Sequence, residues 1–214
     1  MDDIISALFS VSDEQLMWRV KQQDDPHAFA DLMMRWRKRI EHVCARMTGD
    51  RHRAEDLTQT AFARVFAGRR EWEPTGRFST FLWRIAVNLC HDELRRTKRR
   101  GECSLDALDE QGSDNLEFLA VVEPPPDAQA ESDERAELVR GALLRLAPRY
   151  REVLVLRHYE CLKFHEIAQV LAIPEGTVKS RMAEGLNQLT RLLKPLNGDI
   201  ICDPNHQTPK VPVL

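Results

Sequence analysis

Apolar residues in the first half of the chain recur every three or four positions, which is the period of an amphipathic helix. The residues that carry this period are Leu16, Val20, Phe29, Leu32, Met33, Trp36, Ile40, Val43, Leu57, Ala61, Phe62, Val65 and Phe66. Ser12 followed by Gln15 forms a capping box, and Asp24-Asp25-Pro26 interrupts the pattern. The pattern therefore predicts helices over about 12–23, 26–47, 52–67 and 79–99.

The second half contains a different kind of segment. Residues 101–133 are mostly acidic or small and include a triple proline, so they cannot bury enough apolar surface to offset their ordering entropy. Helical periodicity resumes over about 134–146, 149–159, 163–171 and 174–194. We expect an all-α fold without strands, in which a domain over 1–100 is joined by a flexible acidic linker, 101–133, to a helix-turn-helix domain, 134–195. The tail 196–214 is expected to be disordered.

Net charge differs strongly between these segments. The chain carries −3 overall. Residues 64–100 hold ten Lys or Arg against four acids, a charge of +6, and residues 135–195 hold eleven against six, a charge of +5. Residues 101–134 hold eleven acids and no base. Two basic segments on either side of an acidic one suit a protein that binds nucleic acid.

Several classes of protein are disfavoured by the sequence. No apolar run approaches the roughly 18 residues that span a bilayer, and the first residues lack a basic signal region, so we expect a cytoplasmic protein without membrane insertion. The five cysteines are scattered and none forms a CxxC pair, which disfavours a zinc site or a disulfide framework. No GxSxG, Walker or GxGxxG motif occurs, so we expect no enzyme, no cofactor and no metal.

A helix-turn-helix is predicted over Phe164–Arg181. Ile167, Leu171 and Val178 can form its small core, and Ala168 lets the two helices cross closely. The polar residues at the start of the second helix would meet base edges and phosphates in the major groove. The alternative is a plain helical hairpin with a solvated charged face.

The segment Phe78–Arg100 combines aromatic and basic residues. Aromatic rings can stack on unpaired bases while cations follow the phosphates, so the composition suits single-stranded DNA. Phe81 is at least as easily explained as a core residue on the apolar side of this helix as by a role in stacking on bases. Phe78 is the better stacking candidate because we place it in the loop before the helix.

A third candidate surface lies on the helix predicted over 52–67. Asp56, Gln59 and Thr60 fall on one side, and Leu57 and Phe62 fall on another. A polar stripe beside an apolar one suits docking on a partner helix, although most such stripes are solvated faces.

Together these segments resemble the small extracytoplasmic-function sigma factors of the sigma-70 family. The matching motifs, in family order, are Ser12-Asp13-Glu14-Gln15-Leu16, Ala28-Phe29, Ala54-Glu55-Asp56-Leu57-x-Gln59, Phe81-Leu82-Trp83-Arg84-Ile85-Ala86-x-Asn88, Asp92-x-x-Arg95-Arg96, Glu166-Ile167-Ala168 and Gly176-Thr177-Val178-Lys179-Ser180-Arg181. The resemblance implies a transcription initiation factor that directs core RNA polymerase to promoters and melts the −10 element.

The resemblance also implies three sets of site residues. Contact with the polymerase, on the clamp helices of its largest subunit, falls to Asp56, Leu57, Gln59, Thr60 and Phe62. Contact with the melted −10 strand falls to Phe78, Ser79, Thr80, Trp83, Arg84, Asn88, Asp92, Arg95 and Arg96. Contact with the −35 duplex falls to Glu175, Thr177, Lys179, Ser180, Arg181 and Glu184. The flap of the second-largest subunit is a further implied polymerase contact, and whether an anti-sigma factor binds the chain is left open.

The sequence departs from the family pattern at a few positions. Thr60 replaces a usual Glu, Lys163 a usual Ser cap and Ala172 a frequent turn Gly, which costs the hairpin about 1 kcal/mol. Glu184 and Leu186 stand where many members carry Arg, so phosphate binding should be weaker.

Two alternative functions remain at this point. One is a free-standing helix-turn-helix regulator that binds duplex DNA without polymerase, and the other is a helical adaptor or anti-sigma-like protein. The basic charge of both domains disfavours the adaptor, and the aromatic-basic segment favours the sigma factor. We also hypothesise that the acidic linker competes with nucleic acid for the basic domains, against the simpler view that its charge only keeps it soluble.

Overall fold

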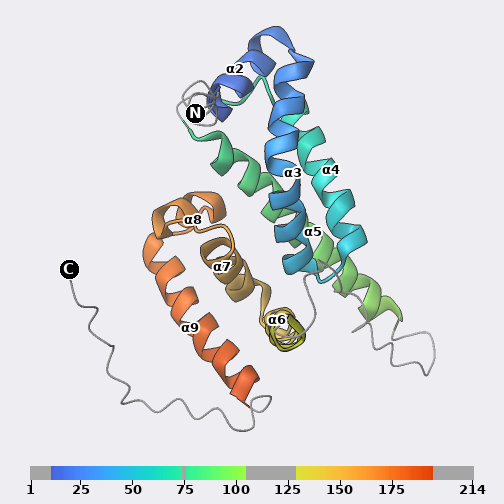
Figure 1. Cartoon of the computed structure of the whole chain (residues 1–214), viewed down its shortest axis with the longest axis vertical. Coiled ribbons are helices and arrows are strands. Elements are labelled where there is room, and N and C mark those ends of the chain that lie inside the picture. The colour runs from blue at the N-terminus through green and yellow to red at the C-terminus, as the bar shows by residue number, and fades with distance from the viewer. Residues whose placement is uncertain (1–10, 74–75, 105–128, 195–214) are drawn as a thin grey trace.

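The computed structural model describes residues 11–73, 76–104 and 129–194, and Figure 1 shows them as helices joined by short turns. The N-terminal module contains α2 (Asp13–Gln23), α3 (Pro26–Thr48), α4 (Arg51–Ala67) and α5 (Phe78–Ser104). The C-terminal module contains α6 (Gln129–Arg145), α7 (Pro148–His158), α8 (Phe164–Leu171) and α9 (Glu175–Leu193). The described ranges contain no strand, and the predicted all-α class is confirmed.

Local sequence signals account for where the helices of the N-terminal module begin. Ser12 and Gln15 form the predicted capping box, with reciprocal hydrogen bonds of 3.1 and 3.0 Å. Asp25 and Asp50 each accept hydrogen bonds from backbone N–H groups of the following helix, which would otherwise lack partners. Gly49 ends α3 with a φ of +79°, a conformation that glycine adopts without strain.

The boundaries around the predicted linker differ from expectation. α5 continues to Ser104, and α6 already begins at Gln129. Residues 129–134 include alanine, glutamine and glutamate, which favour helices, and no proline follows Arg100 before position 124. Helices therefore extend into both ends of the segment 101–133 that was predicted as a flexible linker. The remainder of the linker, 105–128, and the tail 196–214 lie outside the described residues.

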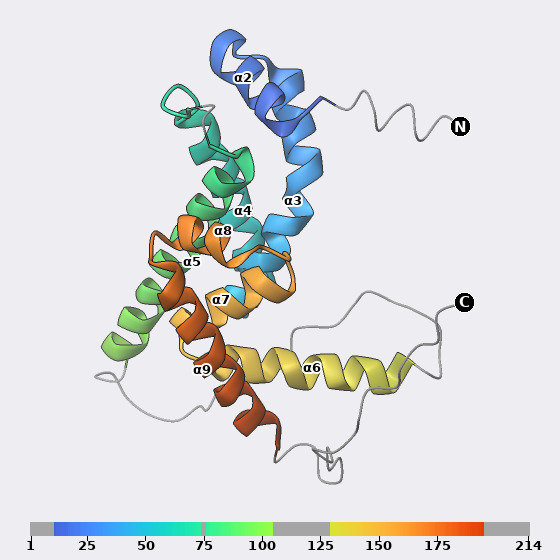
Figure 2. The ribbon, with the colours of Figure 1, turned by 90° about the vertical axis from the view of Figure 1, so that its left-hand side faces the viewer.

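The helices are packed in a different order within each module, and the two modules also contact each other. In the N-terminal module α3 lies against α2, α4 and α5, and their apolar stripes form a shared core. In the C-terminal module α7 lies against α8 and α9, and α6 lies against α9. Figures 1 and 2 show the C-terminal module beside α3 and α5, in agreement with contacts of α5 with α8 and of α3 with α6 and α7.

The helix-turn-helix is formed by α8 and α9. Ala172 ends α8 with a φ of +53°, which confirms that a non-glycine residue occupies the left-handed turn position. Lys163 precedes α8 and has no acceptor in its side chain. Its backbone N–H instead donates to Glu166 Oε2 at 2.8 Å, which supplies half of a capping box.

No helix in the described part of the chain is both long and apolar enough to cross a membrane. Within the same residues, no three His, Cys, Asp or Glu side chains are grouped so that they could hold a metal ion.

Candidate polymerase and nucleic-acid interfaces

The predicted polymerase surface on α4 divides into an exposed and a buried part. Asp56, Gln59 and Thr60 are exposed, and Thr60 Oγ1 donates to the Asp56 carbonyl oxygen at 2.8 Å. Leu57 and Phe62 are buried, and the Phe62 ring packs edge-on against Phe29. The apolar stripe of α4 therefore builds the core, and the assignment of Leu57 and Phe62 to a surface contact is wrong in this conformation.

The aromatic residues at the start of α5 are also internal. Phe78 is the first residue of α5 rather than part of the preceding loop, and both Phe78 and Trp83 are buried. Their ring centroids lie 6.2 and 5.7 Å from that of Trp36 on α3. The placement of Phe78 in a loop was wrong, because its ring completes an aromatic cluster that an amphipathic helix hides from solvent. Neither ring can stack on a base without leaving this cluster.

Further along α5, the polar candidates lie at the surface. Arg84, Asn88, Asp92 and Arg95 are exposed and follow one another at spacings of four, four and three, so they share one side of the helix. Ion pairs of 3.5 Å join Arg95 to Asp92 and Arg96 to Glu93. This polar stripe, together with the exposed Arg96, is the accessible part of the −10 prediction along the described length of α5. Ser79 and Thr80, at the helix start, are half-buried.

The first turns of α9 present a mixed set of polar side chains. Lys179 and Ser180 are exposed, whereas Thr177 is half-buried. Lys179 pairs with Glu175 at 2.7 Å, and this hydrogen bond lowers the pKa of Glu175. Ser180 Oγ donates to the Thr177 carbonyl oxygen at 3.0 Å, and Glu184 accepts a hydrogen bond from Gln188. Lys179 and Ser180 are thus the α9 candidates best placed to meet DNA.

Arg181 occupies a different position from its neighbours. Its Nη1 donates to Glu152 Oε1 at 2.8 Å, and the Glu152 side chain is only 3% exposed. The other oxygen of Glu152 lies 2.5 Å from Nε2 of His91 on α5. A buried carboxylate attracts a cation strongly because little water competes for it. Arg181 is therefore held toward the protein interior and is not free to make the predicted contact with the −35 duplex in this conformation.

Sequence reasoning missed the residues on α7 that organise the C-terminal module. Arg151 is buried and donates to four carbonyl oxygens, those of Leu143, Leu144, Leu146 and Met47. Its burial lowers its pKa. The available signal was an adjacent Arg151-Glu152 pair at the start of the apolar run Val153–Leu156, where charges need buried partners.

Arg149 was also missed. It lies exposed at the start of α7, where its guanidinium stacks over Tyr150. It lines a hollow of about 340 Å³ together with Tyr150, Ser180, Arg181 and Glu184. This hollow connects the start of α7 with the side of α9 that carries Ser180, Arg181 and Glu184.

Comparisons with known proteins show which family the chain belongs to. Family models described as Sigma-70 region 2 and Sigma-70, region 4 match residues 32–100 and 136–189. The chain is 34% identical over 183 residues to the ECF RNA polymerase sigma factor SigW of Bacillus subtilis (strain 168), covering 83% of this chain and 96% of that protein. The chain belongs to the extracytoplasmic-function sigma factors of the sigma-70 family. This sigma factor is also 30% identical over 185 residues to the RNA polymerase sigma-H factor of Pseudomonas aeruginosa, covering 86% and 95% of the two chains.

Solved structures show the same fold. CnrH in complex with the cytosolic domain of CnrY matches with a TM-score of 0.63 at 19% identity, covering 86% of this sigma factor and 97% of that chain. RpoE in complex with the anti-sigma factor NepR from Bartonella quintana matches with a TM-score of 0.62 at 20% identity, covering 78% and 96%.

The family matches coincide with the two modules. Region 2 covers most of α3 through α5, and region 4 covers most of α6 through α9. All candidate residues on α4 and α5 fall within the first match, and all those on α9 fall within the second. The findings support an RNA polymerase sigma factor and not the free-standing regulator.

Proposed function

We propose that this sigma factor joins core RNA polymerase through α4, holds the melted −10 strand along α5 and reads −35 duplex with α9. It acts in the cytoplasm as an initiation factor and carries no catalytic chemistry itself. The observation that supports this division most strongly is the paired family match, because region 2 falls on the module with the exposed α5 stripe and region 4 on the helix-turn-helix.

The polymerase contact is assigned to the exposed polar side of α4. Asp56, Gln59 and Thr60 project from it, and the family resemblance directs this side toward the clamp helices of the largest subunit. The adjacent Glu55 pairs with Arg37 of α3 at 3.3 Å and so lies toward the module itself. Asp56→Arg should weaken binding to core polymerase at least tenfold in a pull-down titration, and Glu55→Arg is the matched control with the same charge change.

The −35 contact is assigned to Lys179 and Ser180, with Arg149 as a supporting phosphate ligand. Ser180 and Arg149 border the hollow between α7 and α9, and Lys179 is exposed beside Ser180 in the first turns of α9, where a helix N-terminus also favours negative charge. A phosphate ligand lowers affinity for all sequences when removed, whereas a base contact changes the preferred sequence. Arg149→Ala should therefore reduce promoter binding uniformly. The flap of the second-largest subunit is the polymerase surface we expect for this module, and an anti-sigma factor stays an expectation of the family resemblance.

Run-off transcription tests the proposed function as a whole. Core polymerase, the purified sigma factor and fragments of the source genome should yield discrete transcripts that neither protein gives alone. Asp56→Arg should abolish them, and Glu55→Arg should leave them. DNA binding without polymerase, together with no core-dependent transcript, would instead restore the free-standing regulator.

A further inference from the structure

Helix α2 holds the connection between α4 and α5 by hydrogen bonds to its backbone. Glu14 Oε1 accepts a hydrogen bond from the backbone N–H of Phe78, the first residue of α5, at 3.2 Å. Lys21 Nζ donates to the carbonyl oxygen of Trp72 at 2.6 Å. Both contacts are partly buried, and they join residues 64 and 51 positions apart in the chain. α2 therefore fixes backbone atoms on both sides of this connection.

The contacts of α2 with the connection follow a regular order. At the end of α2, Asp24 accepts a hydrogen bond from the side chain of Arg69. The contacts thus pair Glu14 with Phe78, Lys21 with Trp72 and Asp24 with Arg69. Residue numbers rise along α2 while those of the partners fall, so α2 runs antiparallel to the connection. Since Glu14 and Lys21 are two helical turns apart, one side of α2 faces the connection along its length.

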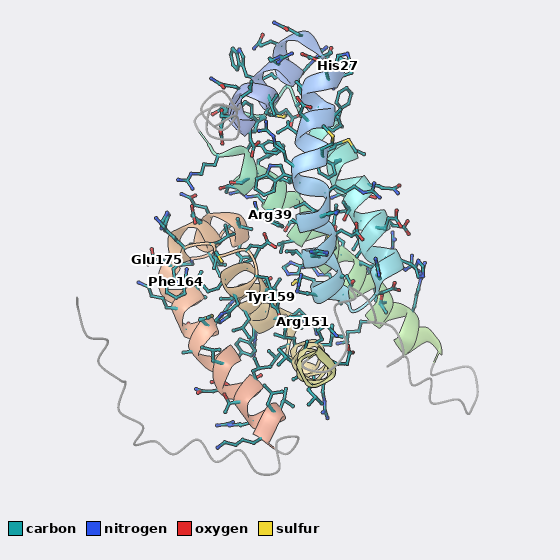
Figure 3. The ribbon with its side chains drawn as sticks, in the orientation of Figure 1. His27, Arg39, Arg151, Tyr159, Phe164 and Glu175 are labelled. Atoms are coloured by element: carbon teal, nitrogen blue, oxygen red, sulfur yellow. The ribbon has the colours of Figure 1, made fainter. Side chains whose placement is uncertain are left out.

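α2 lies at the end of the N-terminal module that is away from Arg151. Figure 3 marks His27, which follows α2, at one end of this module, and Tyr159 and Arg151 toward the other. α2 packs on α3 and α5 of its own module. Its contacts with the connection are therefore internal to the N-terminal module, and their effect can be measured independently of the arrangement of the two modules.

Glu14 supplies an acceptor that the residue before α5 lacks. That residue is Arg77, whose side chain carries only donors. The first N–H groups of a helix have no partner within the helix, and a buried N–H without an acceptor is costly. A carboxylate is also the favourable charge at a helix N-terminus. Glu14 therefore fixes where α5 begins, and the first turn of α5 carries Ser79 and Thr80 of the proposed −10 surface.

We propose that Glu14 and Lys21 are positioning residues for −10 recognition. They act through the backbone of the α4–α5 connection, which they hold so that the first turn of α5 meets the DNA strand in one geometry. This inference rests on the proposed function, because it assumes that α5 binds the −10 strand. It gives α2 a part in promoter selection, although α2 precedes the residues 32–100 that match the region 2 family model.

Paired substitutions in the full chain separate the hydrogen bonds from the charges. Glu14→Gln removes the negative charge but keeps an oxygen acceptor, whereas Glu14→Ala removes both. Lys21→Arg keeps a cationic donor, whereas Lys21→Met removes it. Val43→Ala, in the buried core of α3, is the control for a loss of stability alone.

Amide hydrogen exchange of the free protein, followed by NMR, tests the contact of Glu14 with α5. The Phe78 amide should exchange about tenfold faster in Glu14→Ala than in the parent, because its partner is lost. Glu14→Gln should stay within about threefold of the parent rate. An unchanged rate in Glu14→Ala would overturn the proposal, because Glu14 would then not hold the start of α5.

Promoter selection tests the functional role of both residues. Each variant, with core polymerase, transcribes barcoded templates built on one promoter found by run-off transcription, in which the −10 or the −35 bases are randomised. The preference for the best −10 base should fall about fivefold in Glu14→Ala and Lys21→Met and should recover in Glu14→Gln and Lys21→Arg. The −35 preference should not change. A smaller folded fraction lowers all transcripts together, so Val43→Ala should leave both preferences as in the parent.

The outcomes of the selection experiment distinguish positioning from a merely structural role. The proposal is overturned if Glu14→Ala and Lys21→Met keep the −10 preference of the parent, or if their −10 and −35 preferences fall equally. A parent that initiates transcription without any −10 preference would count against the proposed role of α5, and the positioning role would fall with it.

Discussion

The interiors of the two modules are built from different kinds of residue. The N-terminal module buries a continuous apolar core that includes the aromatic cluster of Trp36, Phe78 and Trp83. The C-terminal module is smaller, and α7 carries two buried charged residues, Arg151 and Glu152, beside its apolar run. The smaller module thus supplements a limited apolar core with charge-assisted hydrogen bonds.

The difference shows how a short helical module can be held in one arrangement. Arg151 satisfies carbonyl oxygens at the end of α6, where a helix leaves acceptors without partners, and it reaches Met47 at the end of α3. Glu152 connects α7 to α9 and to α5. Apolar packing stabilises the module but is not directional. Hydrogen bonds are directional, so these bonds specify which helix ends meet.

Truncation of Phe78 should have the largest effect. Phe78→Ala leaves a cavity in the aromatic cluster and should lower the free energy of unfolding by about 3 to 5 kcal/mol. Denaturant unfolding followed by tryptophan fluorescence measures it, because all four tryptophans lie in the N-terminal module. Phe66→Ala, at a partly exposed ring, should cost less. Unchanged stability with weakened DNA binding would instead make Phe78 a stacking residue.

Replacement of Arg151 should have the next largest effect on stability, and this effect should fall on the C-terminal module. Arg151→Ala strands several buried carbonyl oxygens and should destabilise the C-terminal module by about 3 kcal/mol. Circular dichroism should show an early helical transition that tryptophan fluorescence does not report. The exposed Arg149→Ala should stay within about 0.5 kcal/mol of the parent. Coincident transitions by both probes would show that the modules unfold as one unit.

The Glu152–Arg181 pair should contribute a smaller, mutual effect. A double-mutant cycle with Glu152→Gln and Arg181→Gln should give a coupling energy of about 1 to 2 kcal/mol in unfolding. The same variants sharpen the assignment of Arg181. If Arg181→Gln changes the preferred −35 sequence while the coupling energy is near zero, Arg181 reads a base rather than joining α9 to α7.

The pH dependence of stability that arises from Glu160, at the contact between the two modules, should be the smallest effect. Burial raises the pKa of Glu160 above its ordinary value of 4.5 in spite of Arg39. A raised folded-state pKa contributes stability below the unfolded-state value and loses it as pH rises through the folded-state value. Relative to Glu160→Gln, the parent should therefore become more stable as pH falls from neutrality toward 4.5, measured by thermal melting. Asp24 and Asp25, whose pKa values are lowered, act in the opposite direction below 3.8 and are common to both proteins.

Periodicity and capping predicted the helices well because both are local properties. Ser12, Asp25 and Gly49 mark helix ends through bonds to residues within a few positions. The aromatic residues of α5 were harder to assign, because Phe78 and Trp83 suit a core and a base-stacking surface equally by composition. Only the packing of α3 beside α5 decides between them.

The role of Arg181 depends on partners that are distant in sequence. Glu152 lies 29 positions earlier, and its second partner, His91, lies 61 positions from Glu152. The boundary pairs Arg77–Glu166 and Arg39–Glu160 join different modules, so no periodic pattern could indicate them. Charge counts showed that both modules are basic but could not show that acids of one face arginines of the other.

The two modules pack against each other in the structure, whereas the proposed function gives each module its own contact with polymerase and promoter, so we expect them to separate on the polymerase. A distance between the modules, with and without core polymerase, tests this account most directly. One spin label can occupy the exposed native Cys161, and a second can occupy Met34→Cys, at a position 74% exposed on α3. Cys103 and Cys202 are replaced by Ser, and Cys44 and Cys90 are buried. Double electron–electron resonance should give one short, narrow distance distribution for the free sigma factor and a longer one after core polymerase is added. A distribution that is the same in both samples, or broad in the free protein, would contradict a closed free form that opens on the polymerase.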